Sequence, residues 1–271
     1  MRSYPDLTSI LGLMAIFFAV FFGISIEAHS ISDLLIFFWG KGVWAAWFIV
    51  IGGTIAATFT AFTWGQFSAV IKILTRSFFS TTKYNNLQLI ENFTEYARKI
   101  RREGVRVMEK VIDEVEHPYM KRGLRAVADG LDYETVERIL DAELAIIQER
   151  HAVGQKIFDF AAMCAPSFGL VGAVSGLVRT LINLEDPSKV GPGVALAFVS
   201  TFYGILLAYG LFTPIKNKLE MKHSEEMVTL LLIREGVLAL TKGEPHIVVE
   251  EKLKGYVTGK EREALERRAA V

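Results

Sequence analysis

The sequence predicts an all-α membrane protein with four transmembrane helices and a large cytoplasmic helical insertion between spans two and three. Four uncharged apolar runs are each about as long as a helix that crosses a ~30 Å hydrocarbon core. Charged residues of both signs crowd the stretch 72–156, and 22% of the chain is charged although 51% is hydrophobic. This mixture is typical of membrane spans joined to a water-exposed part.

The composition also argues against several function classes. The formal net charge is zero, so no attraction to nucleic acid is indicated and we expect no nucleic-acid partner. Phosphate loops, paired metal ligands and a nucleophile elbow are missing, which argues against an enzyme, a metal site and a bound cofactor. The single Cys164 is interpreted as a small core residue, and Asp129, Asp132 and Asp141 as solvated helix acids.

The first two spans come before the charged stretch. Leu7–Ile26 predicts span one, a retained anchor because no small-residue cleavage pattern follows it. Leu34–Trp39 is interpreted as a short interfacial helix before the segment around Lys41. Val43–Phe62 predicts span two, where Gly52 and Gly53 allow another backbone to come close.

The insertion shows apolar residues at helical spacing among many charges, which predicts amphipathic helices. His117 precedes Pro118, a pair that predicts the end of one helix because the residue before proline disfavours the α region. Asp132 predicts an N-cap for a helix that starts near Tyr133 and runs on into the membrane.

Spans three and four follow as Phe158–Leu181 and Val194–Thr213. Lys216–Thr241 predicts an amphipathic continuation of span four, and the charged tail from Glu250 is expected to be mobile or peripheral. The predicted domains are therefore 1–71 (spans one and two), 72–156 (helical insertion), 157–215 (spans three and four) and 216–271 (C-terminal helix and tail).

Lysines and arginines predict the orientation. All but Lys41, Arg179 and Lys189 lie in the N-terminal stub, the insertion or the C-terminal region. By the positive-inside tendency these regions are cytoplasmic, so both termini face the cytoplasm of a multi-pass protein in a bacterial inner membrane. The outer loops are short and leave no external domain.

Spans three and four carry small residues along one side of each helix and no carboxylate at membrane depth. Such stripes allow close helix packing, either against a partner helix or among this chain's own spans, and the pattern leaves both open. The residues proposed for partner-helix packing are Gly169, Gly172, Gly176, Ala197 and Gly204.

Ser200 and Thr201 place adjacent hydroxyls beside the small stripe of span four. They can hydrate or coordinate a passing cation, or they can bond to the carbonyl four residues earlier, and the two interpretations are equally favoured. Pro166 and Pro214 each remove an intrahelical hydrogen bond, which indicates a bend or hinge in each helix.

A family resemblance rests on five stretches of the chain. In order they are GGT at Gly52–Thr54, HPYMKRGLRAVADG, LDYETVERILDAELAIIQERH, APSFGLVGAVSGLV at Ala165–Val178 and NLEDPSKVGPGVALAFVSTFYGILLAYGLFTPI at Asn183–Ile215. Nearly the whole chain resembles the MotA/PomA family, the larger stator subunits of the bacterial flagellar motor, which are related to ExbB and TolQ.

The resemblance implies a homo-oligomeric ring of five such chains around two copies of a MotB-like single-span partner. An aspartate of that partner would bind the ion, and the cytoplasmic domain would push the rotor protein FliG. Pro166 and Pro214 match the family's coupling prolines. Arg101 and Glu109, in RKIRREGVRVME, match its rotor contacts, and their spacing of eight residues predicts a shared helix face.

The transported ion is H⁺ or Na⁺. Sodium-type members resemble one another in hydroxyls at three places, which here are Ala173, Ser200 and Thr201, so the pattern is mixed and slightly favours protons. Two alternatives to the stator remain: an ExbB/TolQ-like energiser of envelope transport, whose relatives typically have three spans, and a passive membrane scaffold.

Overall fold

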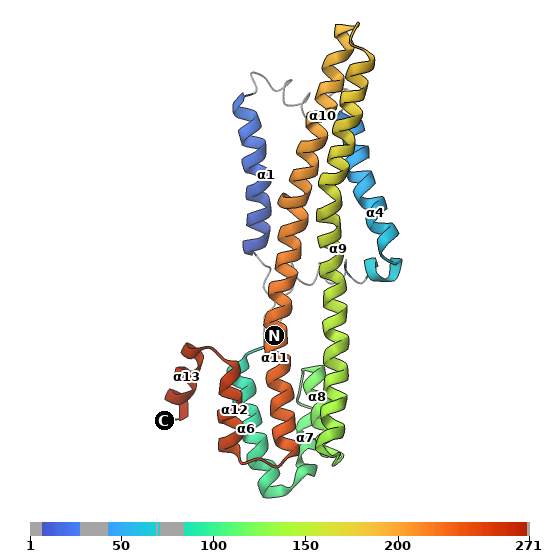
Figure 1. The fold of residues 1–271 in the computed structure, drawn as a ribbon. Coiled ribbons are helices and arrows are strands. Elements are labelled where there is room, and N and C mark those ends of the chain that lie inside the picture. Colours follow the sequence, from blue (N-terminus) through green and yellow to red (C-terminus); the bar gives the residue numbers. More distant parts are fainter. Residues whose placement is uncertain (1–6, 28–42, 69, 71–83, 270–271) are drawn as a thin grey trace. The chain divides into compact units, whose positions relative to one another are not determined.

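The computed structural model describes residues 7–27, 43–68, 70 and 84–269, and these residues form helices and connecting turns without any β-strand. They divide into two compact units (Figure 1). The membrane unit comprises residues up to 81 together with 151–221. The extramembrane unit comprises 82–150 together with 222–271.

Apolar helices occupy all four predicted spans, so the all-α membrane fold is confirmed. The membrane unit contains α1 (Leu7–Glu27), α3 (Val43–Trp47), η1 (Phe48–Gly52), α4 (Gly53–Ala61), the second part of α9 (Tyr133–Ile182), α10 (Pro187–Leu207), η3 (Ala208–Phe212) and the start of α11 (Thr213–Thr241). Among the described residues, three helical stretches are long and apolar enough to cross a membrane, while α1 has a shorter apolar stretch. The expected interfacial helix at Leu34–Trp39 and the segment around Lys41 lie outside the described residues.

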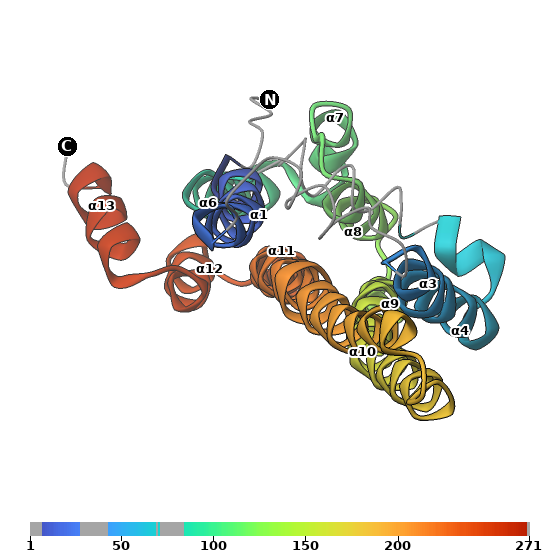
Figure 2. The same cartoon turned by 90° about the horizontal axis from the view of Figure 1, so that it is seen from above.

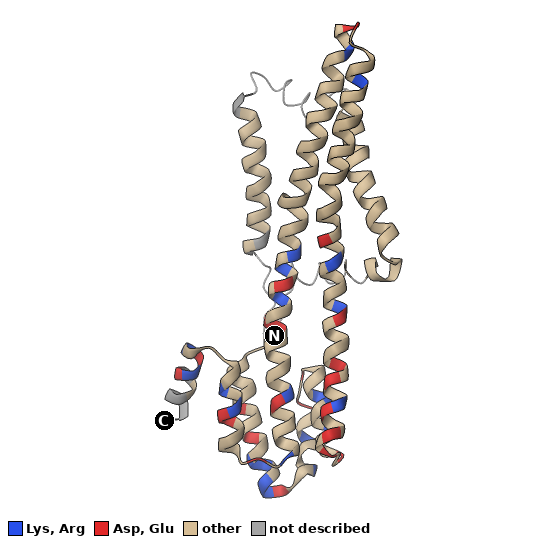
Figure 3. Cartoon of the chain, in the orientation of Figure 1, with Lys and Arg blue, Asp and Glu red and all other residues tan. Residues whose placement is uncertain are grey.

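The spans are helical because the bilayer core offers no water to the backbone. Each N–H and C=O group must therefore find its hydrogen-bond partner within the chain, and a helix provides it. Charged residues gather toward the ends of these helices and are missing from their middles (Figure 3). The turn between α9 and α10 ends at Asp186, whose carboxylate accepts a hydrogen bond from the Ser188 backbone N–H at 3.1 Å. Pro187 follows as the first residue of α10, where its missing N–H removes no helical bond.

The extramembrane unit is built around an apolar core. It contains α6 (Asn86–Glu103), η2 (Val105–Val107), α7 (Met108–Ile112), α8 (Pro118–Ala128), the first part of α9, the second part of α11, α12 (His246–Leu253), η4 (Lys254–Tyr256) and α13 (Gly259–Ala269). Phe93 of α6, Leu124 of α8, Leu140 of α9 and Ile233 of α11 are fully buried in one cluster. Three helices that follow one another in the sequence thus share one core with α11, which lies far along the chain.

Two of the predicted helix boundaries can be compared with the structure. Asp132 caps α9 as predicted, because its carboxylate accepts a hydrogen bond from the Thr135 backbone N–H at 2.9 Å and α9 begins at Tyr133. His117-Pro118 does mark a boundary, but it starts α8 instead of ending a helix, since the preceding α7 already ends at Ile112.

The C-terminal tail differs from the prediction. Val249 and Leu253 of α12 are fully buried, and Val257 and Leu265 are nearly so. These residues recur at four- and eight-residue intervals and pack into the same core as α6 and α11. The expectation of a mobile or peripheral tail is therefore wrong, because apolar residues of α12 and of the segment that follows it are buried between the charges of the tail.

His117 supplies a prediction about pH. It is 9% exposed, its ring packs against Tyr84 at a tilt of 52° with ring centroids 4.4 Å apart, and its Nδ1 has no hydrogen-bond partner among the described residues. Burial lowers the pKa of His117 from 6.5 to about 4. As pH falls, His117 is therefore protonated in the unfolded chain before it is protonated in the folded chain. The free energy of unfolding should decrease by up to about 3 kcal/mol between pH 6.5 and pH 4, with no further decrease from this group at lower pH.

We expect the His117→Phe variant, which keeps an aromatic ring against Tyr84 but cannot be protonated, to lose less stability than the parent chain on acidification. The measurement is the protection of α8 amides against hydrogen exchange between pH 7 and 4, corrected for intrinsic rates. Equal pH dependence in the two proteins would contradict this assignment.

Candidate functional site

Helices α9 and α10 lie side by side and antiparallel in the membrane unit (Figures 1 and 2). A Cβ added to Gly176 would come within 2.5 Å of the carbonyl oxygen of Gly193 and 2.6 Å of the backbone nitrogen of Ala197. A Cβ on Gly204 would come within 2.8 Å of the carbonyl oxygen of Ala165. The two backbones are therefore in direct contact, which only glycine permits at these positions.

This contact locates the small-residue stripes. The structure places them between the chain's own helices, which is one of the two alternatives that the pattern left open. The buried members include all five residues proposed for partner-helix packing, namely Gly169, Gly172, Gly176, Ala197 and Gly204.

The two neighbouring hydroxyls have different surroundings. Ser200 is fully buried, its Oγ donates to the Leu196 carbonyl oxygen at 2.7 Å, and a Cβ on Gly172 would collide with it. Thr201 is exposed on the outer face of α10 and donates to the Ala197 carbonyl oxygen at 3.1 Å. Both hydroxyls donate to the carbonyl oxygen four residues earlier, but Ser200 is a buried residue and Thr201 an exposed one.

Thr201 lies within an exposed apolar face of α10. Phe198, Ile205 and Tyr209 are 73%, 50% and 69% exposed and follow one another at helical spacing with Thr201 between them. Ala173 of α9 is half-buried. An apolar face of this kind suits lipid or another helix, and a hydroxyl in its middle gives that surface one uncharged oxygen ligand.

No carboxylate accompanies this hydroxyl. Neither 160–178 nor 190–215 contains a charged residue. Among the residues that the structure describes, no group of three or more His, Cys, Asp or Glu side chains could hold a metal ion. A cation that moved along this face would need an acid from another chain, because an oxygen of a hydroxyl alone does not offset the loss of hydration.

The two prolines lie at weakened places of their helices. Pro166 is inside α9, where a Cβ on Gly204 would come within 3.2 Å of its Cα atom. Pro214 is the second residue of α11, which directly follows η3, a π-helical turn. A second π-helical turn, η1, interrupts span two. Sequence reasoning missed both turns, which often accompany functional sites in helices.

An ion pair joins α9 to α11 close to Pro214. Lys216 Nζ lies 3.1 Å from Asp159 Oδ1 and 3.4 Å from Glu220 Oε1. Phe158 and Phe212 also face each other, with ring centroids 6.5 Å apart. This pair was missed as well, because Asp159 and Lys216 are far apart in the sequence and only the antiparallel packing of the helices brings them together.

Arg101 and Glu109 are both exposed in the extramembrane unit. Arg101 is in the last turn of α6 and Glu109 in the first turn of α7, and Gly104 separates them with a φ of 84°. The expectation that they share one helix face is wrong, because glycine at that left-handed φ ends α6 before Glu109.

The comparisons with known proteins agree with this arrangement. A model of the MotA/TolQ/ExbB proton channel family matches residues 111–230. The chain is 36% identical to Motility protein A of Borreliella burgdorferi over 80% of this chain and 84% of that protein. The chain belongs to the MotA/TolQ/ExbB proton channel family. It is also 33% identical to Motility protein A of Bacillus subtilis over 95% and 93% of the two chains.

A solved structure supports the same assignment. The structure of the flagellar MotAB stator complex from Bacillus subtilis is similar with a TM-score of 0.84 and 32% identity, covering 96% of this chain and 99% of that chain. The stretch that matches the family model contains α8, α9 and α10 and therefore includes the glycine contact and Thr201. The resemblance stated from the motifs is confirmed.

Proposed function

We propose that this chain is the larger subunit of an ion-driven flagellar stator. With a single-span MotB-like partner it conducts protons across the inner membrane and generates torque on the rotor. The observation that carries this proposal is the exposed Thr201 in an apolar helix face, with no carboxylate in 160–178 or 190–215. Such a surface is half of an ion site, and the similarity to a MotAB stator complex indicates the kind of partner that supplies the acid.

In this proposal the partner's membrane aspartate binds the ion beside Thr201, with Ala173 and Ser200 in the adjoining hairpin. Ser200 affects the ion site only by packing α10 against α9, because its hydroxyl is enclosed against Gly172. Thr201 supplies the oxygen that the ion meets. The mixed pattern of one alanine, one serine and one threonine favours protons over sodium.

The chain assembles as a homo-oligomeric ring, which we propose to be a pentamer around two partner chains. Exposed apolar side chains on α1 and on the outer faces of α9 and α10 offer the surface for neighbouring subunits. Pro166 and Pro214 pass the movement of the spans to the extramembrane unit. Arg101 and Glu109 contact FliG, each from its own helix, through weak pairs that can be renewed at every step.

The orientation follows from the basic residues. Both termini and the extramembrane unit are cytoplasmic, since nearly all lysines and arginines lie there. This places Asp159 and Lys216 at the inner end of the spans and Asp186 in an outer turn.

The test is ion flux through the chain co-expressed with its partner and reconstituted in liposomes. A proton gradient should drive flux that stops when the partner's aspartate is changed to asparagine, while a sodium gradient alone should not. In cells, swimming speed should be insensitive to sodium concentration and should fall with a proton uncoupler. Flux that persists without the aspartate would overturn the proposed ion site.

An ExbB/TolQ-like energiser is the second candidate, because the matched family model covers those proteins too. It predicts that deletion of the gene leaves swimming intact and weakens envelope transport. Loss of swimming with an intact flagellar filament would favour the stator.

A further inference from the structure

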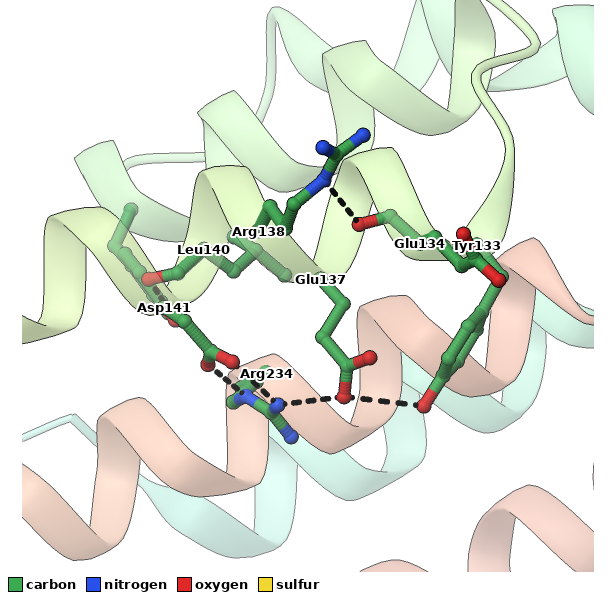
Figure 4. Close-up of polar contacts among 8 residues, drawn as sticks. Tyr133, Glu134, Glu137, Arg138, Leu140, Asp141 and Arg234 are labelled. Carbon is green, nitrogen blue, oxygen red and sulfur yellow. Dashed lines mark hydrogen bonds and ion pairs between the residues drawn. The ribbon is translucent and has the colours of Figure 1, made fainter.

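A polar network around Arg234 joins α9 to α11 in the extramembrane unit (Figure 4). Its guanidinium donates to Asp141 through Nε, at 2.5 Å from Oδ1, and through Nη2, at 2.9 Å from Oδ2. Nη2 also lies 2.8 Å from Glu137 Oε1. The hydrogen bond from Arg234 lowers the pKa of Asp141, so the pair stays ionised at neutral pH.

The network extends to the beginning of α9. The Tyr133 hydroxyl donates to Glu137 Oε1 at 3.3 Å, and Lys242 Nζ lies 4.1 Å from the centre of the Tyr133 ring. Arg234 belongs to α11 and Lys242 directly follows its last residue, while Tyr133, Glu137 and Asp141 belong to α9. Two successive contacts therefore join the first turns of α9 to the C-terminal end of α11.

Apolar burial, not this network, holds the two helices together. Val136 and Leu140 of α9 and Ile233 and Val237 of α11 are fully buried in the same core. The network is partly open to water, because the side chains of Arg234, Glu137 and Asp141 are 21%, 34% and 49% exposed. Ion pairs that are open to water add little to the free energy of unfolding. The main contribution of the Arg234 network is therefore to the geometry of the helix pair and not to its stability.

The bidentate arginine adds geometric specificity. Apolar contacts are non-directional, whereas two parallel N–H···O bonds form only at one position of α11 along α9 and at one rotation of the helix. A slip of one helical turn, about 5.4 Å, would break both bonds to Asp141 and the bond to Glu137. The fork therefore fixes the register of α11 on α9.

We propose that Arg234 is a positioning residue that locks the register of α11 against α9 so that both helices deliver force to the extramembrane unit as one body. This inference rests on the proposed stator function. Both helices contribute residues to the membrane unit and to the extramembrane unit, so a load on the rotor-facing unit acts across their contact. Without this lock, α11 slips along α9 under high load and torque is lost. The two helices keep their positions when little force acts.

The test uses the full chain with its partner in swimming cells and measures the step in motor speed when one stator unit joins. Arg234→Lys keeps the charge and removes the fork. The speed step should shrink at high load and equal that of the parent chain near zero load, while ion flux per complex in liposomes stays unchanged. Arg138→Lys is the matched control, since among the described residues the hydrogen bonds of the Arg138 side chain go to Glu134 and Thr135 of its own helix.

A second pair of variants keeps the result interpretable if Arg234→Lys folds poorly. Arg234→Asp should lose the high-load step, and adding Asp141→Arg should restore it by reversing the pair. Equal speed steps at all loads would overturn the inference, as would a loss of flux in proportion to torque. A parent chain that drives no rotation but folds and assembles would instead refute the stator function itself.

Discussion

Replacing Gly176 by alanine is expected to separate α9 from α10 and to abolish assembly of a working complex. The added Cβ would meet the carbonyl oxygen of Gly193 at 2.5 Å and the nitrogen of Ala197 at 2.6 Å, and both are backbone atoms that cannot rotate away. Overpacking of a tight contact costs about 1–3 kcal/mol and more where the backbone must move. The measurement is the thermal stability of the purified complex and its partner content after size-exclusion chromatography.

The matched control is Gly191→Ala in the same hairpin. Gly191 is exposed within α10, and a Cβ there would meet no atom within 4 Å. Because alanine favours helix over glycine by up to about 1 kcal/mol, this variant should be as stable as the parent chain or slightly more stable. Should both variants keep full stability and partner content, the backbone contact between α9 and α10 would not exist as described.

The spans could be predicted because their signal is local. Uncharged runs of the right length, such as Leu7–Ile26, can satisfy their backbone only as helices in a membrane. The start of α9 was equally readable, since the side chain of Asp132 bonds to a backbone group three residues away. Features that depend on neighbours in the sequence were predicted well for this reason.

Features that depend on which helices meet were not predictable in this way. The stripe with Gly172 and Gly176 can pack against a helix of a partner or against another helix of this chain, and the sequence does not distinguish the two. The structure shows that α10 covers it. The same packing decides that Ser200 is enclosed and Thr201 exposed, although they are adjacent. The ion pair of Asp159 with Lys216 likewise exists only through the antiparallel hairpin.

Backbone irregularities formed a third group. The π-helical turns η1 and η3 have no reliable signature in composition, and the glycine pair at Gly52 was interpreted only as a place of close approach. Gly104 broke the expected shared face of Arg101 and Glu109 because a positive φ cannot be read from the residue alone. The roles of Arg101 and Glu109 thus depend on how two helix ends are placed.

Replacing Thr201 by valine is expected to slow ion flux strongly and to stop swimming while the complex still assembles. Valine keeps the branched shape of threonine, so the apolar face formed with Phe198 and Ile205 is preserved, and only the oxygen is lost. A hydrogen bond to a charged group is worth about 1.5–3 kcal/mol. Its loss at the barrier should slow flux by about ten- to a hundredfold.

Two further variants identify the oxygen as the cause. Thr201→Ser keeps the hydroxyl and should keep flux, whereas Ser200→Ala removes a hydroxyl that faces Gly172 inside the hairpin and should leave flux close to that of the parent chain. Liposome flux and swimming speed are measured on complexes with equal partner content. If Thr201→Val swims normally, or if Ser200→Ala alone stops flux, the ion passes on the inner side of α10 and the exposed face serves only for packing.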